Sequence, residues 1–429
     1  MKINLKQDKL INNTIWSLSG KIAAMLFTVL LDIIIARFLT VGEYAEWVYF
    51  FSILTMLFYI GWLGINASAK VYVSKTAGVT DRANCIGASL ILRTGVSIAV
   101  GILIIIIMPL LSVHLGYPDK YPELKTLMQM SAFLVILNSF TEFFKEICIG
   151  LEKYKNLFLI SVCEYGGYLL FSILTLCISH NVRSVAFGYM ISGTGILFLG
   201  MGILQRDAGF RYSHMDTAYK EYIKPVLKYA LPIAVIGLGS LVLIEMDTFM
   251  LGLFSTKAEV AAYSIVKNLC SKATHVNYAL TVGTVTSLSV ITAENFEEKK
   301  REFHKVYRVN LWITIIVSAA LMFIGPAAIL FLYGAKYAEA GIIIRLLVPY
   351  YAMQGISNFC SAFLDFRGKA RLRSICYVSI IIINLLLNYL WIPLYGAKGA
   401  ALATDLSLIP YTVFVIISSF RQFYKRNKQ

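Results

Sequence analysis

Long apolar runs recur along the chain and alternate with short polar stretches. Each run is long enough for an α-helix to cross a hydrocarbon core of about 30 Å. The pattern is therefore typical of a multi-pass, all-α integral membrane protein. It predicts twelve transmembrane helices, at residues 12–37, 44–66, 84–111, 122–149, 157–179, 183–204, 228–254, 259–291, 309–333, 341–363, 373–393 and 399–420.

The distribution of Lys and Arg orients these helices. The polar segments on the side of the N-terminus hold 25 Lys and Arg residues. Those on the other side hold five, which are Lys120, Arg183, Lys257, Lys336 and Lys398. Cytoplasmic loops carry such an excess of positive charge. We therefore predict a protein of the cell inner (cytoplasmic) membrane with both termini in the cytoplasm.

Composition and net charge agree with this interpretation. The 429 residues are 58% hydrophobic and only 15% charged, far less charge than a soluble domain of this length would carry. The net charge of +15 could suggest a nucleic-acid partner. Because the basic residues gather on the inner side, they are expected to face anionic membrane lipids instead, and no nucleic acid is predicted.

Short signatures repeat at an offset of about half the chain. Leu31-Asp32 matches Met246-Asp247, 215 residues later, at the same place in a predicted helix. Further matches at offsets of 215 to 217 are Arg183 with Lys398, Pro109 with Pro326, and Lys120-Tyr121 with Lys336-Tyr337. Six helices per half give both halves the same orientation, as in transporters built from parallel repeats. The sequence predicts two six-helix lobes, at residues 1–212 and 213–429.

Motifs at the helix junctions carry a family resemblance. They are Ala36-Arg37-Phe38-Leu39, Gly64-Ile65-Asn66-Ala67, Leu231-Pro232 and Tyr395-Gly396-Ala397-Lys398-Gly399. In these motifs the chain resembles the polysaccharide-transporter branch of the multidrug/oligosaccharidyl-lipid/polysaccharide exporter (MOP) superfamily, the O-antigen flippases in particular. The resemblance implies two lobes around a central cavity. It also implies export of undecaprenyl-diphosphate-linked repeat units for O-antigen or lipopolysaccharide, with polysaccharide assembly proteins as further partners.

The sequence offers no support for an enzyme. It contains no GxxxxGK[ST] phosphate loop and no HExxH motif, and its five histidines are scattered. The predicted outer loops are all short, whereas membrane polymerases and lipid-linked glycosyltransferases generally need a sizeable one to hold sugar. We predict a transporter without cofactor or metal, driven by an ion gradient, the substrate gradient or both.

Several basic residues fall inside the predicted helices. They are Lys21, Arg93, Lys267 and Lys272, with His275 one turn beyond Lys272. A charge near the bilayer centre costs about 2.5–3.5 kcal/mol on insertion scales, so it tends to face a cavity or a partner. If the four cations line a cavity, they favour an anionic headgroup such as a diphosphate. The alternative is that each one reaches a lipid headgroup or neutralises a nearby acid.

Acidic residues inside the helices allow two interpretations. Asp32 and Asp247 occupy equivalent repeat positions, about two turns from the outer ends of their helices. They could carry a coupling proton or Na⁺, or they could be structural and pair with Lys or cap a neighbouring helix. Glu142, Lys145 and Glu146 are spaced for pairing within one helix, as a self-neutralising set.

Two polar stripes complete the candidate site. One contains Gln354 and Asn358, and the other contains Asn384 and Asn388. Amide side chains suit sugar hydroxyls, but hydrogen bonding between helices explains them equally well. We predict a flippase for a lipid-linked oligosaccharide that works by alternating access. The alternatives are a cation-coupled multidrug exporter, whose cavity should be acidic, and a membrane-embedded polysaccharide polymerase.

Overall fold

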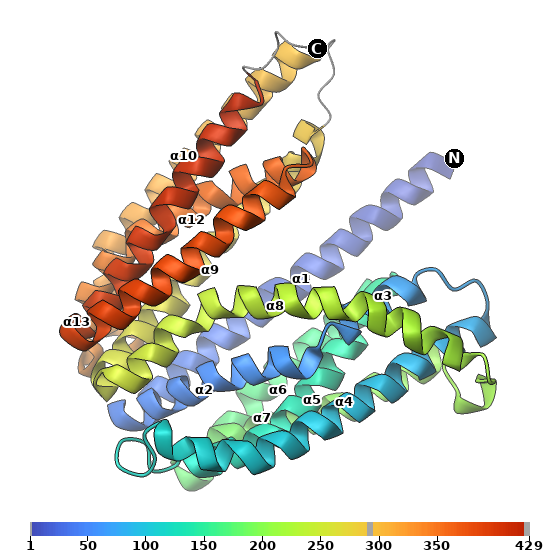
Figure 1. Cartoon of the computed structure of the whole chain (residues 1–429), viewed down its shortest axis with the longest axis horizontal. Coiled ribbons are helices and arrows are strands. Elements are labelled where there is room, and N and C mark those ends of the chain that lie inside the picture. The colour runs from blue at the N-terminus through green and yellow to red at the C-terminus, as the bar shows by residue number, and fades with distance from the viewer. Residues whose placement is uncertain (1, 290–294, 424–429) are drawn as a thin grey trace. The chain divides into compact units, whose positions relative to one another are not determined.

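The computed structural model describes residues 2–289 and 295–423, and every regular element in that part of the chain is a helix (Figure 1). Contacts divide the chain into two compact units, Met1–Glu245 and Met246–Gln429. The division falls inside helix α8 (Tyr219–Phe254). The lobe boundary at 212/213, which rests on the sequence repeat, stays a prediction.

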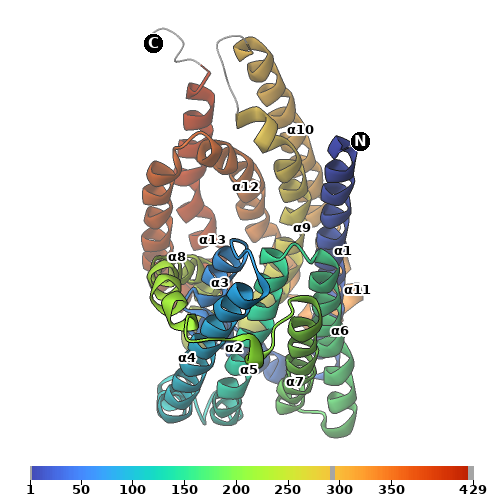
Figure 2. The same cartoon turned by 90° about the vertical axis from the view of Figure 1, so that its right-hand side faces the viewer.

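The described part of the first unit contains seven α-helices, the short 3-10 helix η1 (Tyr212–His214) and the first part of α8. The seven are α1 (Lys2–Phe38), α2 (Val41–Trp62), α3 (Ile65–Val73), α4 (Val79–His114), α5 (Leu124–Gly150), α6 (Tyr154–Ser179) and α7 (Val182–Asp207). Helix α6 packs against α7 and α1, and Figure 2 shows the three running alongside one another. Helix α5 packs against α2, α3, α4 and α7, so it forms the centre of this unit.

The second unit continues from the last turns of α8. It contains α9 (Lys257–Ser289), α10 (Phe296–Phe323), α11 (Gly325–Tyr333), α12 (Ala340–Phe366) and α13 (Ala370–Arg421). Helix α12 is central here, because it packs against α9, α10, α11 and α13. Helix α13 is interrupted at Gly396 and corresponds to the last two predicted helices. The predicted end of one helix at residue 291 lies outside the described residues.

Backbone breaks recur at the repeat offset. Gly116 and Gly334 have φ angles of 102° and 101°, and each precedes the Lys-Tyr pair of its half. His180, with φ 30°, separates α6 from α7, and Gly396, with φ 57°, interrupts α13 at the matching place. The duplication seen in the sequence thus extends to the backbone.

The prediction of one helix at 44–66 was wrong at its inner end. Helix α2 begins earlier, behind a capping box of Thr40 and Glu43, and ends at Trp62. Leu63 and Gly64 then adopt left-handed conformations, and α3 follows as a separate helix. Position 64 favours glycine, because the Cβ of any other residue would collide with the carbonyl oxygen of Ala230 on α8, 2.2 Å away.

Seven helices in the described part of the chain are long and apolar enough to cross a membrane. Their outer faces carry large exposed apolar side chains, among them Ile178 at 82% and Phe198 at 73% exposure. Exposure of so much apolar surface to water is unfavourable, whereas its contact with lipid is not. Together with the two-lobe helical architecture, this identifies a multi-pass membrane protein.

Candidate functional site

Asp247 lies at the centre of a hydrogen-bond network in the second unit. Its side chain is buried, with 6% exposure. One carboxylate oxygen accepts from the Tyr263 hydroxyl and from Thr404 Oγ1, each at 2.8 Å. The other accepts from Asn388 Nδ2 at 2.6 Å. The charge of a buried carboxylate is thus met by three donors from two other helices.

The turn between α8 and α9 brings these donors together. Glu259 forms a capping box with Thr256 at the start of α9. The same carboxylate accepts from the backbone N–H of Ala397 at 3.3 Å, directly after the break in α13 at Gly396. The break lets residues on both sides of it, Asn388 and Thr404, reach the carboxylate of Asp247.

A second layer of amides surrounds Asp247. Asn388 Nδ2 also donates to Asn384 Oδ1 at 3.0 Å, and Asn384 Nδ2 donates to Thr404 Oγ1 at 3.5 Å. Asn388 is fully buried, and its Oδ1 has no hydrogen-bond partner. An acceptor without a partner in such a place is costly, and it marks where a proton donor or a cation would be favourable.

The oxygen atoms around Asp247 are of the kind that bind a proton or a monovalent cation. Carboxylate, amide and hydroxyl oxygens are the ligands that hard cations take. Among the described residues, no three His, Cys, Asp or Glu side chains come together as a metal site would require. With Asp247 as the acid and Asn384, Asn388 and Thr404 around it, the site offers one negative charge and several neutral oxygens.

Asp32 in the first unit has a related environment. It lies on α1 and accepts from the Tyr44 hydroxyl at 2.8 Å, as Asp247 accepts from Tyr263 on the helix that follows it. Asp32 is half-buried rather than buried, and Lys21, eleven residues before it on the same helix, is exposed. The two acids therefore repeat in sequence and in a tyrosine partner, but Asp247 is the more enclosed.

The basic candidates of the second unit lie on α9. Lys267 is half-buried, and its Nζ donates to Thr248 Oγ1 at 3.1 Å, next to Asp247 in the chain. Its backbone carbonyl accepts from the Tyr351 hydroxyl on α12 at 3.1 Å. Lys272 is half-buried and His275 exposed on the following turns.

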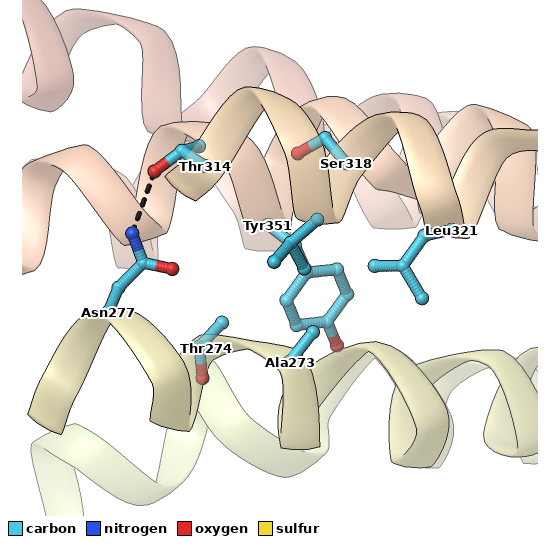
Figure 3. Close-up of a pocket in the computed structure, with 8 residues that line it drawn as sticks. Ala273, Thr274, Asn277, Thr314, Ser318, Leu321 and Tyr351 are labelled. Atoms are coloured by element: carbon cyan, nitrogen blue, oxygen red, sulfur yellow. Dashed lines mark hydrogen bonds between the residues drawn. The ribbon is translucent and has the colours of Figure 1, made fainter. Parts of the chain in front are cut away.

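A small pocket lies between α9, α10 and α12 beside these residues (Figure 3). Asn277 donates to Thr314 Oγ1 at 2.7 Å across it, and Tyr351 forms one wall. The pocket has room for a water-sized molecule only. Gln354 and Asn358, predicted to meet sugar, are half-buried on α12 and do not line it.

Arg93 is placed differently from the other candidate cations. It is fully buried in the first unit, where its guanidinium donates to the backbone carbonyls of Gly61 and Trp62 and to Asn66 Oδ1. Those carbonyls end α2, so Arg93 caps the break before α3. Its donors are used by these contacts, and the role predicted for Arg93 in substrate binding stays a prediction.

The self-neutralising set predicted on one helix needs a correction. Lys145 does pair with Glu142, at 2.6 Å, as the spacing indicated. Glu146 instead pairs with Lys70 of α3 at 2.7 Å, and Lys145 pairs in addition with Glu164 of α6 at 2.5 Å. Glu164 is not among the predicted site residues, although it is an acid inside the apolar run 157–179 and that position was the available signal.

Comparisons with known proteins identify the family. A model of the family described as polysaccharide biosynthesis protein matches residues 10–287, and a MatE model matches residues 232–390. The chain is 26% identical over 323 residues to the capsular polysaccharide biosynthesis protein CapF of Staphylococcus aureus. This alignment covers 68% of this chain and 74% of CapF.

Two solved structures share the fold. One is an inward-facing multidrug resistance MATE family transporter of the MOP superfamily, with a TM-score of 0.75, 15% identity, and coverage of 94% of this chain and 96% of that one. The other is the lipid II flippase MurJ in an inward closed conformation, with a TM-score of 0.74, 16% identity, and coverage of 97% and 89%. Because the first family model spans more than half of the residues, the chain belongs to the polysaccharide biosynthesis protein family.

Proposed function

We propose that this protein is a transporter, a flippase of the MOP superfamily, that moves an undecaprenyl-diphosphate-linked oligosaccharide, an O-antigen or similar repeat unit, across the inner membrane by alternating access, without catalysing a reaction. The N- and C-termini are then cytoplasmic. The observation that carries the proposal is the pair of half-buried Lys side chains on α9, Lys267 and Lys272, in a chain rich in helices that can cross a membrane. Lys267 lies ten residues into α9, about 15 Å along the axis. An anionic diphosphate is the substrate group that such ammonium groups favour.

The proposed substrate site uses two packed helices. Lys267, Lys272 and His275 come from α9, and Gln354 and Asn358 come from α12, which packs against it. The cations would meet the diphosphate, and the amides would meet sugar hydroxyls. Lys21 on α1 is proposed as a further cation of the first lobe. This division of roles is the one expected for a lipid-linked, charged and sugar-bearing substrate.

Replacement of both α9 lysines tests the substrate class. In a host that lacks its own transporter, Lys267→Ala with Lys272→Ala should abolish surface glycan while the amount of membrane protein stays near that of the wild type. Arg at either position should restore part of the activity, because it keeps the charge. Lys257→Ala, on the first turn of the same helix, is the matched control and should transport normally. Full activity of the double variant would refute the role of these lysines.

We also propose that Asp247 carries the coupling ion, with Asp32 as its counterpart. A buried carboxyl that exchanges a proton or Na⁺ can bias the two states of a transporter as alternating access requires. Asp247→Asn should abolish the dependence of transport on an imposed proton or Na⁺ gradient in reconstituted vesicles, while downhill movement persists. Asp32→Asn tests the other lobe in the same assay. Unchanged gradient dependence in both variants would make these acids structural.

A cation-coupled multidrug exporter is the second candidate, and the match of residues 232–390 to the MatE model favours it. Such an exporter typically handles cationic compounds, so removal of Lys267 and Lys272 should improve transport of a cationic dye. A flippase for an anionic substrate should lose activity in the same variant. Dye efflux and surface glycan, measured on the same cells, separate the two.

A further inference from the structure

A buried ionic cluster in the first lobe has more negative than positive charge. Lys145 of α5 lies between two carboxylates, with Glu142 at 2.6 Å and Glu164 of α6 at 2.5 Å. The Lys145 side chain is 10% exposed, that of Glu164 only 2%, and that of Glu142 28%. With both carboxyl groups ionised, these three residues, which we call the Lys145 triad, carry a net charge of −1.

The depth of the triad makes this charge costly. Glu164 lies ten residues into α6 and Glu142 eight residues before the end of α5. At 1.5 Å per residue, these places are about 15 Å and 12 Å from the helix ends, and α6 is one of the helices long and apolar enough to cross a membrane. An uncompensated charge at that depth is unfavourable, and one ammonium group can neutralise only one of two carboxylates.

The described surroundings of the triad supply no second cation. Among the described residues, no other Lys or Arg pairs with Glu142 or Glu164. The titratable side chains that face the triad from α6, α7 and α2 are tyrosines: Tyr165, Tyr168, Tyr189 and Tyr59. The remaining charged groups nearby are acids or are paired. Asp32 interacts electrostatically with Tyr189, and Glu245 with Tyr59. Glu146 pairs with Lys70.

We propose that the Lys145 triad is a proton-binding site that holds one proton, shared by Glu142 and Glu164. Protonation of either carboxyl group leaves one carboxylate and one ammonium, so the triad becomes neutral. A metal cation fits less well, because the Lys145 ammonium already lies within 2.6 Å of both carboxylates. Glu142 is the most exposed member of the triad, at 28%. This site is separate from Asp247, which lies in the other lobe.

Infrared spectroscopy of the purified transporter in lipid tests the proposal without any transport. Isotope labelling of glutamate distinguishes its carboxylic acid band from that of aspartate. At neutral pH the wild type should show the carboxylic acid band of about one protonated glutamate. Glu142→Gln and Glu164→Gln should each remove this band, because the triad then has one carboxylate and one ammonium and is neutral without a proton. Glu146→Gln, which breaks a one-to-one pair with Lys70, is the matched control and should leave the band unchanged.

Lys145→Met makes the opposite prediction. Two buried carboxyl groups would then have no cation, so the band should grow to about two protonated glutamates. A wild-type spectrum without the band, or a band that neither Gln variant removes, would overturn the proposal, and so would an unchanged band in a folded Lys145→Met variant. Because the readout needs no substrate, it stands or falls independently of the proposed function. If Lys145→Met does not fold, the two Gln variants decide alone.

Discussion

Replacing Asp247 with Ala would remove the acceptor that three buried donors share. Thr404 Oγ1 keeps an alternative acceptor, the Ala400 carbonyl at 2.8 Å, so it should lose little. The Tyr263 hydroxyl and one N–H of Asn388 would be left without a partner. An orphaned buried donor costs about 1–3 kcal/mol. With two of them, Asp247→Ala should lower the free energy of unfolding by about 2–6 kcal/mol.

Adding Tyr263→Phe to Asp247→Ala should reverse part of this loss. The second substitution removes one of the two orphaned donors, so the double variant should regain about 1–3 kcal/mol over Asp247→Ala. Alone, Tyr263→Phe should destabilise, because it takes a hydrogen bond from a buried carboxylate. The same substitution is thus stabilising in one background and destabilising in the other.

A double-mutant cycle measures this change of sign. Unfolding of the purified protein in mixed micelles, followed by circular dichroism, gives the four free energies. The control cycle is Asp32→Ala with Tyr44→Phe, where the acid is only half-buried and the coupling should be smaller. Additive effects at Asp247 and Tyr263 would mean that the two side chains do not share the hydrogen bond, and the network described above would be wrong.

Two further predictions concern the backbone and the topology. Gly396→Ala should destabilise the protein by about 1–3 kcal/mol in the same assay, because φ 57° and ψ −134° suit only glycine and the new Cβ would collide with Glu259. Gly195→Ala on α7 is the control and should not destabilise it, because there is open space around that position. In a variant without native cysteines, cysteines at positions 119, 257 and 336 should react with an impermeant maleimide from outside and those at 211 and 300 should not; the reverse pattern would contradict cytoplasmic termini.

The sequence alone predicts the helices and the repeat well. The predicted helices at 157–179 and 183–204 lie within α6 (154–179) and α7 (182–207), and the break between the last two predicted helices is found at Gly396. The repeat also singled out Asp32 and Asp247 as a pair before any contact was known. These features are local, because a span depends on the transfer of one contiguous segment into lipid and a cap depends on neighbouring residues.

Only the tertiary structure decided which groups meet. The spacing within one helix predicted the pair of Lys145 and Glu142, but Glu164 reaches the same ammonium from another helix. Asn388 lies 141 residues from its partner Asp247. The break after Trp62 has no strong local signal before Gly64 and is stabilised by Arg93, about thirty residues later.

The physical reason is that a partner is chosen by the rotation and depth of each helix in its lobe. Both depend on the packing of every neighbouring helix together. The length of an apolar run gives the approximate ends of a helix, but inside a membrane lobe it does not fix the face that turns toward a given neighbour. The charges of this protein could therefore be located from its sequence, whereas their compensation, by three donors at Asp247 and by one ammonium for two carboxylates at Lys145, depends on the folded lobes.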